Sequence, residues 1–214
     1  MSATQFPIFT IGHSNHSLVE FAKLLLEHRI DVVADVRSSP YSRYVPHFNR
    51  DTLKPHLRDC TGGAIGYQFL GDQLGGRPLD NSLYDSEGRV VFTRLADEDS
   101  FDIGLRRIIH NADEHRIALM CSEKDPIECH RTILIAEALL ERSVAVEHIH
   151  ADGSLEDQRA AMDRLLSKFK LPLNGDLFRS RDDVITEALA MQARKIAYVA
   201  EGRAAYQGSR QAVS

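Results

Sequence analysis

The amino-acid sequence predicts an α/β fold: a mainly parallel sheet of about five strands flanked by helices on both faces, with a C-terminal helical extension. Short apolar runs rich in β-branched residues alternate along the chain with segments of helical periodicity. The first strand, helix and strand follow one another so closely that they predict a right-handed parallel unit. The length of 214 residues and the hydrophobic content of 43% suit a single core. We therefore expect one domain over residues 1–170 that carries a site, with residues 171–214 packed on it as the extension.

The first half of the chain contains the clearest strand–helix–strand unit. Residues 8–11 form an apolar run, and the capping box from Ser17 to Glu20 predicts a helix that ends near Arg29. Residues 32–36 predict a second strand that is covered on both faces. After a long polar excursion, residues 67–70 predict a third, weaker strand.

The second half continues the alternation. Residues 105–115 predict a helix and residues 117–120 a fourth strand. Asp125, Pro126 and Glu128 combine three helix-start signals, so we expect a helix from Pro126 to about Arg142. Residues 144–149 predict a fifth strand. The segment from Ser154 to Asp157 predicts the cap of another helix, and Ser180 precedes a last long helix over residues 181–200, beyond which the end of the chain is expected to fray.

Composition excludes several classes of protein. A net charge of −5 and a pI near 6.0 argue against non-specific coating of nucleic acid, which needs a cationic surface. Residues 1–7 lack a secretory leader, and the longest apolar stretches are strand-sized, so we expect no membrane association. Three cysteines in this context predict free thiols in a reducing compartment, the cytoplasm. There is no Walker loop or Gly-x-Gly-x-x-Gly motif, and the sequence indicates neither a cofactor nor an oligomeric state.

Polar side chains follow most of the predicted strands at the point where each strand ends. Ligands of open parallel sheets bind at this edge, so the coincidence predicts a functional site there. The residues concerned are His13, Ser14, Asp35, Arg37, Asp72, Cys121, Glu123, His150 and Asp152.

The segment from Cys121 to Arg131 carries the strongest chemical signal. A thiol at Cys129 near a helix start has a lowered pKa and becomes a plausible nucleophile. His130 serves as its base only if the backbone turns the imidazole towards the thiol, because adjacent helix residues diverge by about 100°. Arg131 offers a bidentate grip on phosphate or carboxylate. The alternative is that Cys121 and Cys129 are small buried hydrophobic residues.

A basic and aromatic stretch follows Arg37. It contains Arg43, Arg50, Lys54 and Arg58 with interleaved aromatic rings, a combination that holds phosphates and stacks bases. The alternative is a surface excursion whose aromatic rings pack inwards. Against the acidic remainder of the chain, the stretch favours a phosphate-bearing ligand, with Arg37, Arg43 and Arg131 as candidate contacts and Asp35 beside them.

Several motifs, in the same order, resemble the family catalogued as domain of unknown function 488: TIGHSNHS, DVRSSPYSRYVPHFN, YQFLGDQLGG, ALMCSEKDPIECHR and HIHADG. The resemblance covers nearly the whole chain, including the closing DLFRSRDDVITEALAMQARKIAYV. It implies a bacterial or archaeal intracellular α/β domain with no established activity, substrate or cofactor. By match to the motifs it implies a site made of His13, Asp35, Arg37, Cys121, Cys129, His130 and Arg131.

Three functional hypotheses are consistent with these residues. The first is a cysteine- and histidine-dependent hydrolase or transferase acting on a phosphate-bearing, nucleotide-like or nucleic-acid substrate. Its nucleophile is Cys129 or Cys121 and its proton carrier is His13 or His130. The second is a binding module without chemistry. The third is a thiol redox or metal site, although the two thiols are spaced more widely than in common zinc motifs. All three require the chain to bring these side chains together at one end of the sheet.

Overall fold

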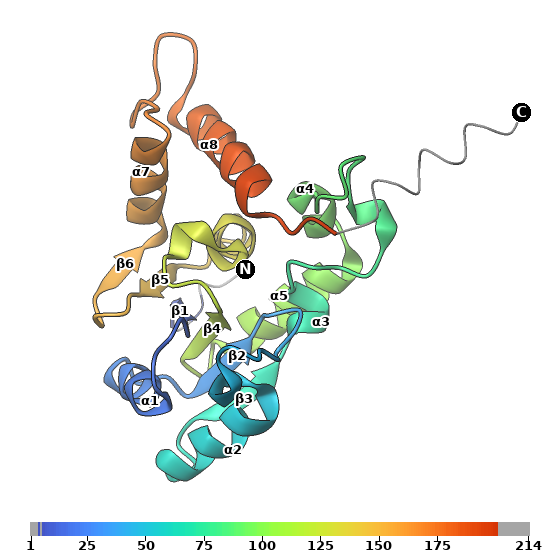
Figure 1. Cartoon of the computed structure of the whole chain (residues 1–214). Coiled ribbons are helices and arrows are strands. Elements are labelled where there is room, and N and C mark those ends of the chain that lie inside the picture. Colours follow the sequence, from blue (N-terminus) through green and yellow to red (C-terminus); the bar gives the residue numbers. More distant parts are fainter. Residues whose placement is uncertain (1–3, 5, 201–214) are drawn as a thin grey trace, which may run out of the picture.

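The computed structural model describes residue 4 and residues 6–200, which form a six-stranded sheet between two layers of helices (Figure 1). The strand order is β3-β2-β4-β1-β5-β6, and β6 is the one antiparallel member of this sheet. The strands are β1 (Ile8–Gly12), β2 (Val32–Asp35), β3 (Gly66–Phe69), β4 (Ile117–Cys121), β5 (Val146–Ile149) and β6 (Leu155–Asp157). The predicted α/β fold with a mainly parallel sheet is confirmed. The predicted frayed end, residues 202–214, lies outside the described residues.

Two hydrophobic clusters cover the two faces of the sheet, because successive strand residues point to opposite sides. In β1, Phe9 and Ile11 join the cluster under α1 (Leu18–Glu27) and α2 (Arg50–Cys60). Ile8 joins the larger cluster on the other face. The helices of that face include α3 (Gly71–Leu74), α4 (Phe92–Ala96), α5 (Asp99–Asn111), α7 (Gln158–Lys168) and α8 (Arg181–Ile196).

The capping box predicted at Ser17 and the helix start predicted after Ser180 are confirmed. The Ser17 hydroxyl accepts from the Glu20 backbone N–H, and the Glu20 carboxylate accepts from the Ser17 N–H at 2.9 Å. Ser180 and Asp183 form the same reciprocal pair at the start of α8. These local hydrogen bonds satisfy donors that a helix start would otherwise leave unpaired.

The prediction of one continuous helix from Pro126 is wrong. Asp125 caps only the short 3-10 helix η3 (Pro126–Glu128), and Cys129 then adopts an extended backbone with φ −135° and ψ 144°. The chain resumes as the π-helix η4 (Arg131–Ala136) and continues as α6 (Glu137–Leu140). The start signals correctly predict a single helical turn. Beyond that turn the backbone is extended at Cys129, whose side chain contacts Glu123 and His130.

Other elements also differ from the prediction, and the helices expected over residues 105–115 and 181–200 end earlier, at Asn111 and Ile196. Residues 155–157 pair with β5 as an edge strand, so Asp157 rather than Ser154 caps α7, accepting from Ala160 N–H at 2.7 Å. Helix α5 begins at Asp99 and includes Gly104, where a Cβ atom would lie 2.8 Å from Leu74. Helix α2 was missed, because its charged sequence contains Pro55.

Strand register brings the candidate residues to one edge. Gly12 lies opposite Cys121 in the β1–β4 pair, and Asp35 lies opposite Met120 in the β2–β4 pair. The carboxyl ends of β1, β2 and β4 therefore share one end of the molecule. Within the described part of the chain, no helix has the length and apolar character needed to cross a membrane.

His148 gives the core a measurable pH dependence. Its Nδ1 lies 2.7 Å from Thr10 Oγ1 and its Nε2 lies 2.6 Å from Gln158 Oε1, and burial lowers its pKa to about 4. The unfolded chain takes up a proton near pH 6.5 and the folded chain only near pH 4, so acidification through this window favours unfolding.

We predict that His148→Gln reduces the loss of unfolding free energy between pH 7 and pH 5 by about 2 kcal/mol. Urea unfolding of both proteins at the two pH values measures this difference. The variant is expected to be less stable at both pH values, but this offset cancels in the comparison. An equal loss in the two proteins would contradict a neutral His148.

Candidate functional site

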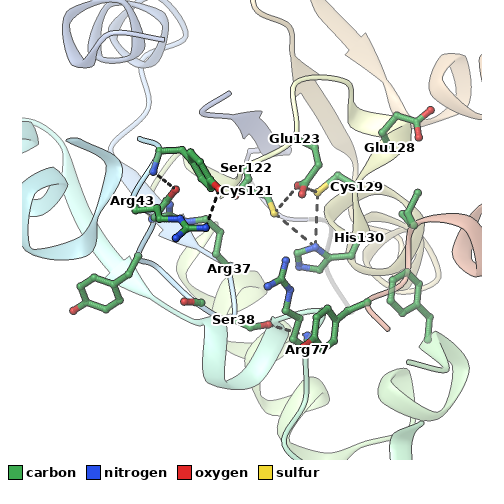
Figure 2. Close-up of a pocket in the computed structure, with 18 residues that line it drawn as sticks. Arg37, Ser38, Arg43, Arg77, Cys121, Ser122, Glu123, Glu128, Cys129 and His130 are labelled. Atoms are coloured by element: carbon green, nitrogen blue, oxygen red, sulfur yellow. Dashed lines mark hydrogen bonds between the residues drawn. The ribbon is translucent and has the colours of Figure 1, made fainter. Parts of the chain in front are cut away.

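A cavity of about 680 Å³ opens at the carboxyl ends of β2 and β4 (Figure 2). It is lined by the loop after β2, the loop after α3, the segment between Cys121 and His130, and the end of α8. Six of the residues expected at the site line this cavity together: Arg37, Arg43, Cys121, Glu123, Cys129 and His130. The chain thus brings residues separated by about ninety positions into one space.

Two thiols and an imidazole form a compact cluster at the floor of the cavity. Cys121 is the last residue of β4, and Cys129 and His130 lie between η3 and η4. His130 Nδ1 is 3.7 Å from the Sγ atom of each cysteine, and the three groups lie within 4.8 Å of one another. The extended backbone at Cys129 makes this possible, because in a continuous helix Cys129 and His130 would diverge. We call these three residues the sulfur–imidazole cluster.

The tautomer of His130 follows from its other nitrogen. Nε2 lies 3.2 Å from the carbonyl oxygen of Val36, which can only accept a hydrogen bond. Nε2 therefore carries a proton, and Nδ1 faces the two sulfur atoms. The pKa of His130 is raised: burial opposes the charge, but the adjacent Cys129 and its hydrogen bond outweigh that effect.

Glu123 completes the cluster on the side of the cavity. The residue is exposed, yet its Oε2 accepts from Cys121 Sγ at 3.1 Å and from Cys129 Sγ at 2.9 Å. Partial burial of the carboxylate and the neighbouring Cys129 raise its pKa. Glu123 is thus placed to take up or return a proton beside the sulfur atoms.

The pKa values of the two thiols are shifted in opposite directions. Burial disfavours a thiolate at Cys129, but a hydrogen bond from Cys121, the charge of Arg131 and His130 outweigh it, and the pKa of Cys129 is lowered. The Arg131 backbone N–H also points at Cys129 Sγ, at 3.5 Å. The pKa of Cys121 is raised, because its proton is held by Cys129 and because burial disfavours a second charge.

Arg37 reaches the same cavity from the end of β2, held by a buried ion pair. Its Nε and Nη2 donate to the two oxygens of Asp35 at 2.8 and 2.6 Å, and Nη2 also donates to the Phe48 carbonyl. Nη1 donates to His13 Nε2 at 3.1 Å. Burial would lower the pKa of Arg37, but Asp35 outweighs this and raises it. Four of the five guanidinium N–H groups are engaged in this way, which leaves one for a ligand.

His13 lies behind Arg37 rather than in the cavity. Its ring stacks on Phe48 at a centroid distance of 4.4 Å, and its Nδ1 donates to the Ser14 carbonyl at 3.0 Å. Burial and the charge of Arg37 lower its pKa to about 4. With both nitrogens engaged in a neutral ring, His13 does not fit the expected role of proton carrier, and it positions Arg37 instead.

Arg131 also differs from its expected role. Its side chain is completely buried and donates to the Glu123 carbonyl at 2.8 Å, the Lys124 carbonyl at 3.4 Å and the Thr10 hydroxyl at 3.3 Å. These hydrogen bonds are made to β1 and to the loop after β4, and Arg131 does not line the cavity in which it was expected to contact a ligand. It fixes the loop that carries Glu123.

Two further cationic side chains stand at the rim. The guanidinium of Arg43 lies over the Tyr44 ring at 5.0 Å, and that of Arg77 lies over Tyr198 at 4.7 Å. Arg77 was not among the residues expected at the site, although the neighbouring glycine pair, Gly75 and Gly76, was a signal in the sequence. A Cβ atom at Gly76 would lie 3.2 Å from His130 Cγ, so this loop packs directly against the sulfur–imidazole cluster.

Other expected members lie elsewhere. His150 and Asp152 line a separate pocket, where His150 pairs with Glu156 at 3.0 Å. Asp72 is exposed on α3. The end of the C-terminal extension contributes Ile196 and Tyr198 to the cavity wall.

Comparison with known proteins identifies one family. A family model described as "Domain of unknown function DUF488" matches residues 17–139, a span that contains Asp35, Arg37 and the sulfur–imidazole cluster but excludes His13 and α8. Neither the curated proteins nor the solved structures contain a match.

The Asp35–Arg37 pair allows a stability test. Asp35→Asn leaves the buried guanidinium without its counter-charge, so the free energy of unfolding should fall by about 3–5 kcal/mol. Tyr67→Phe is the matched control: it removes one hydrogen bond to Asp35 of 2.6 Å and should cost about 1 kcal/mol. Denaturant unfolding measures both. Equal losses would show that the ion pair does not hold Arg37 in place.

Proposed function

Because the chain belongs to the family described as "Domain of unknown function DUF488", whose description names no activity, we propose its function from the site: a hydrolase or transferase that depends on Cys121, Cys129 and His130 and acts on a phosphate-bearing substrate. One observation carries the proposal. Guanidinium groups and the sulfur–imidazole cluster face a single cavity (Figure 2). A site that both holds an anion and presents reactive groups is suited to group transfer.

Arg37, Arg43 and Arg77 bind the phosphate group in this proposal. A guanidinium presents a planar fork of donors that matches phosphate oxygens. Arg37 is held by its four hydrogen bonds and has one remaining N–H, whereas Arg43 and Arg77 are exposed at the rim, where they lie over the rings of Tyr44 and Tyr198. The hydroxyl groups of Ser38 and Ser42 border the same space.

The sulfur–imidazole cluster supplies the attacking group and moves its proton. His130 Nδ1 faces the sulfur atoms, and the Glu123 carboxylate lies within 3.1 Å of both. Groups of raised pKa beside a group of lowered pKa are the arrangement that acid–base chemistry needs near neutral pH. Such unpaired thiols fit the reducing environment of the cytoplasm.

Turnover of model substrates tests the proposal. We expect the protein to cleave at least one of p-nitrophenyl phosphate, bis(p-nitrophenyl) phosphate and a short single-stranded oligonucleotide. Cys129→Ser should abolish this activity. Arg43→Ala and Arg77→Ala should each lower kcat/KM by about tenfold, the effect of one charge-assisted hydrogen bond.

Arg58→Ala is the matched control, since Arg58 is exposed, pairs with Asp59 and lies outside the cavity. Its kcat/KM should equal that of the unsubstituted protein. The proposal fails if none of these esters is cleaved, or if cleavage continues at the same rate in Cys129→Ser.

A non-catalytic nucleic-acid binding module is the second candidate. Tyr41 and Tyr44 favour it, because their rings are 53% and 80% exposed beside Arg43 and are available for stacking on bases. Such a protein would bind the oligonucleotide without cleaving it, and its affinity would fall steeply with salt.

A further inference from the structure

We propose that the sulfur–imidazole cluster is a binding site for Zn²⁺. Zinc bonds of about 2.3 Å to sulfur and about 2.0–2.1 Å to nitrogen, arranged tetrahedrally, separate a sulfur and a nitrogen ligand by about 3.6 Å. His130 Nδ1 lies 3.7 Å from the Sγ atoms of both Cys121 and Cys129. Both sulfur–nitrogen distances therefore match the spacing that a tetrahedral ion requires, and the two sulfur atoms lie within 4.8 Å of each other.

The surroundings of the three ligands match those of a metal site. A zinc-binding histidine donates its second ring nitrogen to a carbonyl or carboxylate, which fixes the tautomer. The Nε2 of His130 makes this contact with the Val36 carbonyl. The backbone N–H of Arg131 supports Cys129 Sγ from behind, and both cysteines are buried. The ligands are thus oriented before any ion binds.

The ligand types select the metal. Two sulfur atoms and one imidazole favour a thiophilic ion such as Zn²⁺, whereas Mg²⁺ and Ca²⁺ prefer oxygen ligands. The long separation of the two cysteines in sequence does not prevent binding, since the end of β4 and the turn after η3 bring them together.

The fourth coordination position faces the cavity, on the side where Glu123 lies. Three protein ligands and one open position are typical of catalytic rather than structural zinc. This step rests on the proposed function. In it, the ion supplies the attacking group. A bound water gives its proton to Glu123, and the resulting hydroxide bonds to phosphorus. The P–O ester bond breaks, and the leaving oxygen takes the proton back from Glu123.

Metal titration of the full chain tests the site without any substrate. After reduction, treatment with a chelator and removal of the chelator, the protein should bind one Zn²⁺ or Co²⁺ per chain and should not bind Mg²⁺. Co²⁺ bound by two thiolates should show a sulfur-to-cobalt charge-transfer absorption. Native mass spectrometry of the unsubstituted chain should show the added mass of one Zn²⁺, a readout that does not depend on any variant.

Single substitutions identify which side chains bind the ion. Cys121→Ser, Cys129→Ser and His130→Ala should each weaken Zn²⁺ binding at least about 100-fold, the upper range for loss of a supporting contact. Cys60→Ser is the matched control, because Cys60 is the exposed cysteine at the end of α2 and should not affect the affinity. Glu123→Gln should retain the ion within about tenfold and lose ester cleavage.

A reduced chain that binds neither Zn²⁺ nor Co²⁺, or that binds them equally well without both buried thiols, overturns the proposal. Loss of the ion in Glu123→Gln overturns the open fourth position. Ester cleavage that persists in the chelated protein rejects a role for zinc in the reaction and leaves the proposed function standing. Zinc binding without cleavage of any phosphate ester rejects the proposed function and leaves the zinc site standing.

Discussion

The buried guanidinium of Arg131 is the constraint on which the site depends. It lies under the loop after β4 and joins that loop to β1 through the Thr10 hydroxyl. The acceptors it reaches among the described residues are neutral oxygens, so its positive charge is compensated by no carboxylate at hydrogen-bond distance. This uncompensated charge is among the causes that lower the pKa of the Cys129 thiol, which links the loop held by Arg131 to the chemistry of the sulfur atom.

Close packing at the end of β1 depends on the same loop. A Cβ atom at Gly12 would lie 1.9 Å from the Glu123 carbonyl, so only glycine admits the loop at this distance. The carbonyl that excludes a side chain at Gly12 is the one that accepts from Arg131. The position and orientation of Glu123 are therefore set by backbone contacts, and its carboxylate accepts hydrogen bonds from the two sulfur atoms.

The interruption of the helix at Cys129 is the second feature that creates the site. Two residues separate η3 from the π-helix η4, Cys129 with an extended backbone and His130 with a helical one. The Cys129 carbonyl accepts hydrogen bonds from the backbone N–H groups of Thr132 and Ile133, where the helix restarts. π-Helical turns are rare and often occur at functional sites. Here the irregular backbone directs Cys129 and His130 to the same side, which a regular helix cannot do.

The sequence by itself determined the alternation of strands and helices, the caps at Ser17 and Ser180, and the sheet edge where polar residues gather, because periodicity and capping are local properties. Only the tertiary structure decided that Arg37 faces the cavity while the guanidinium of Arg131 donates hydrogen bonds to backbone carbonyls. It also decided that Asp157 ends a strand, that Arg77 joins the site, and that Cys129 leaves the helix. Each of these depends on contacts between different elements of the fold, and the local spacing of residue types along the chain carries no information about such contacts.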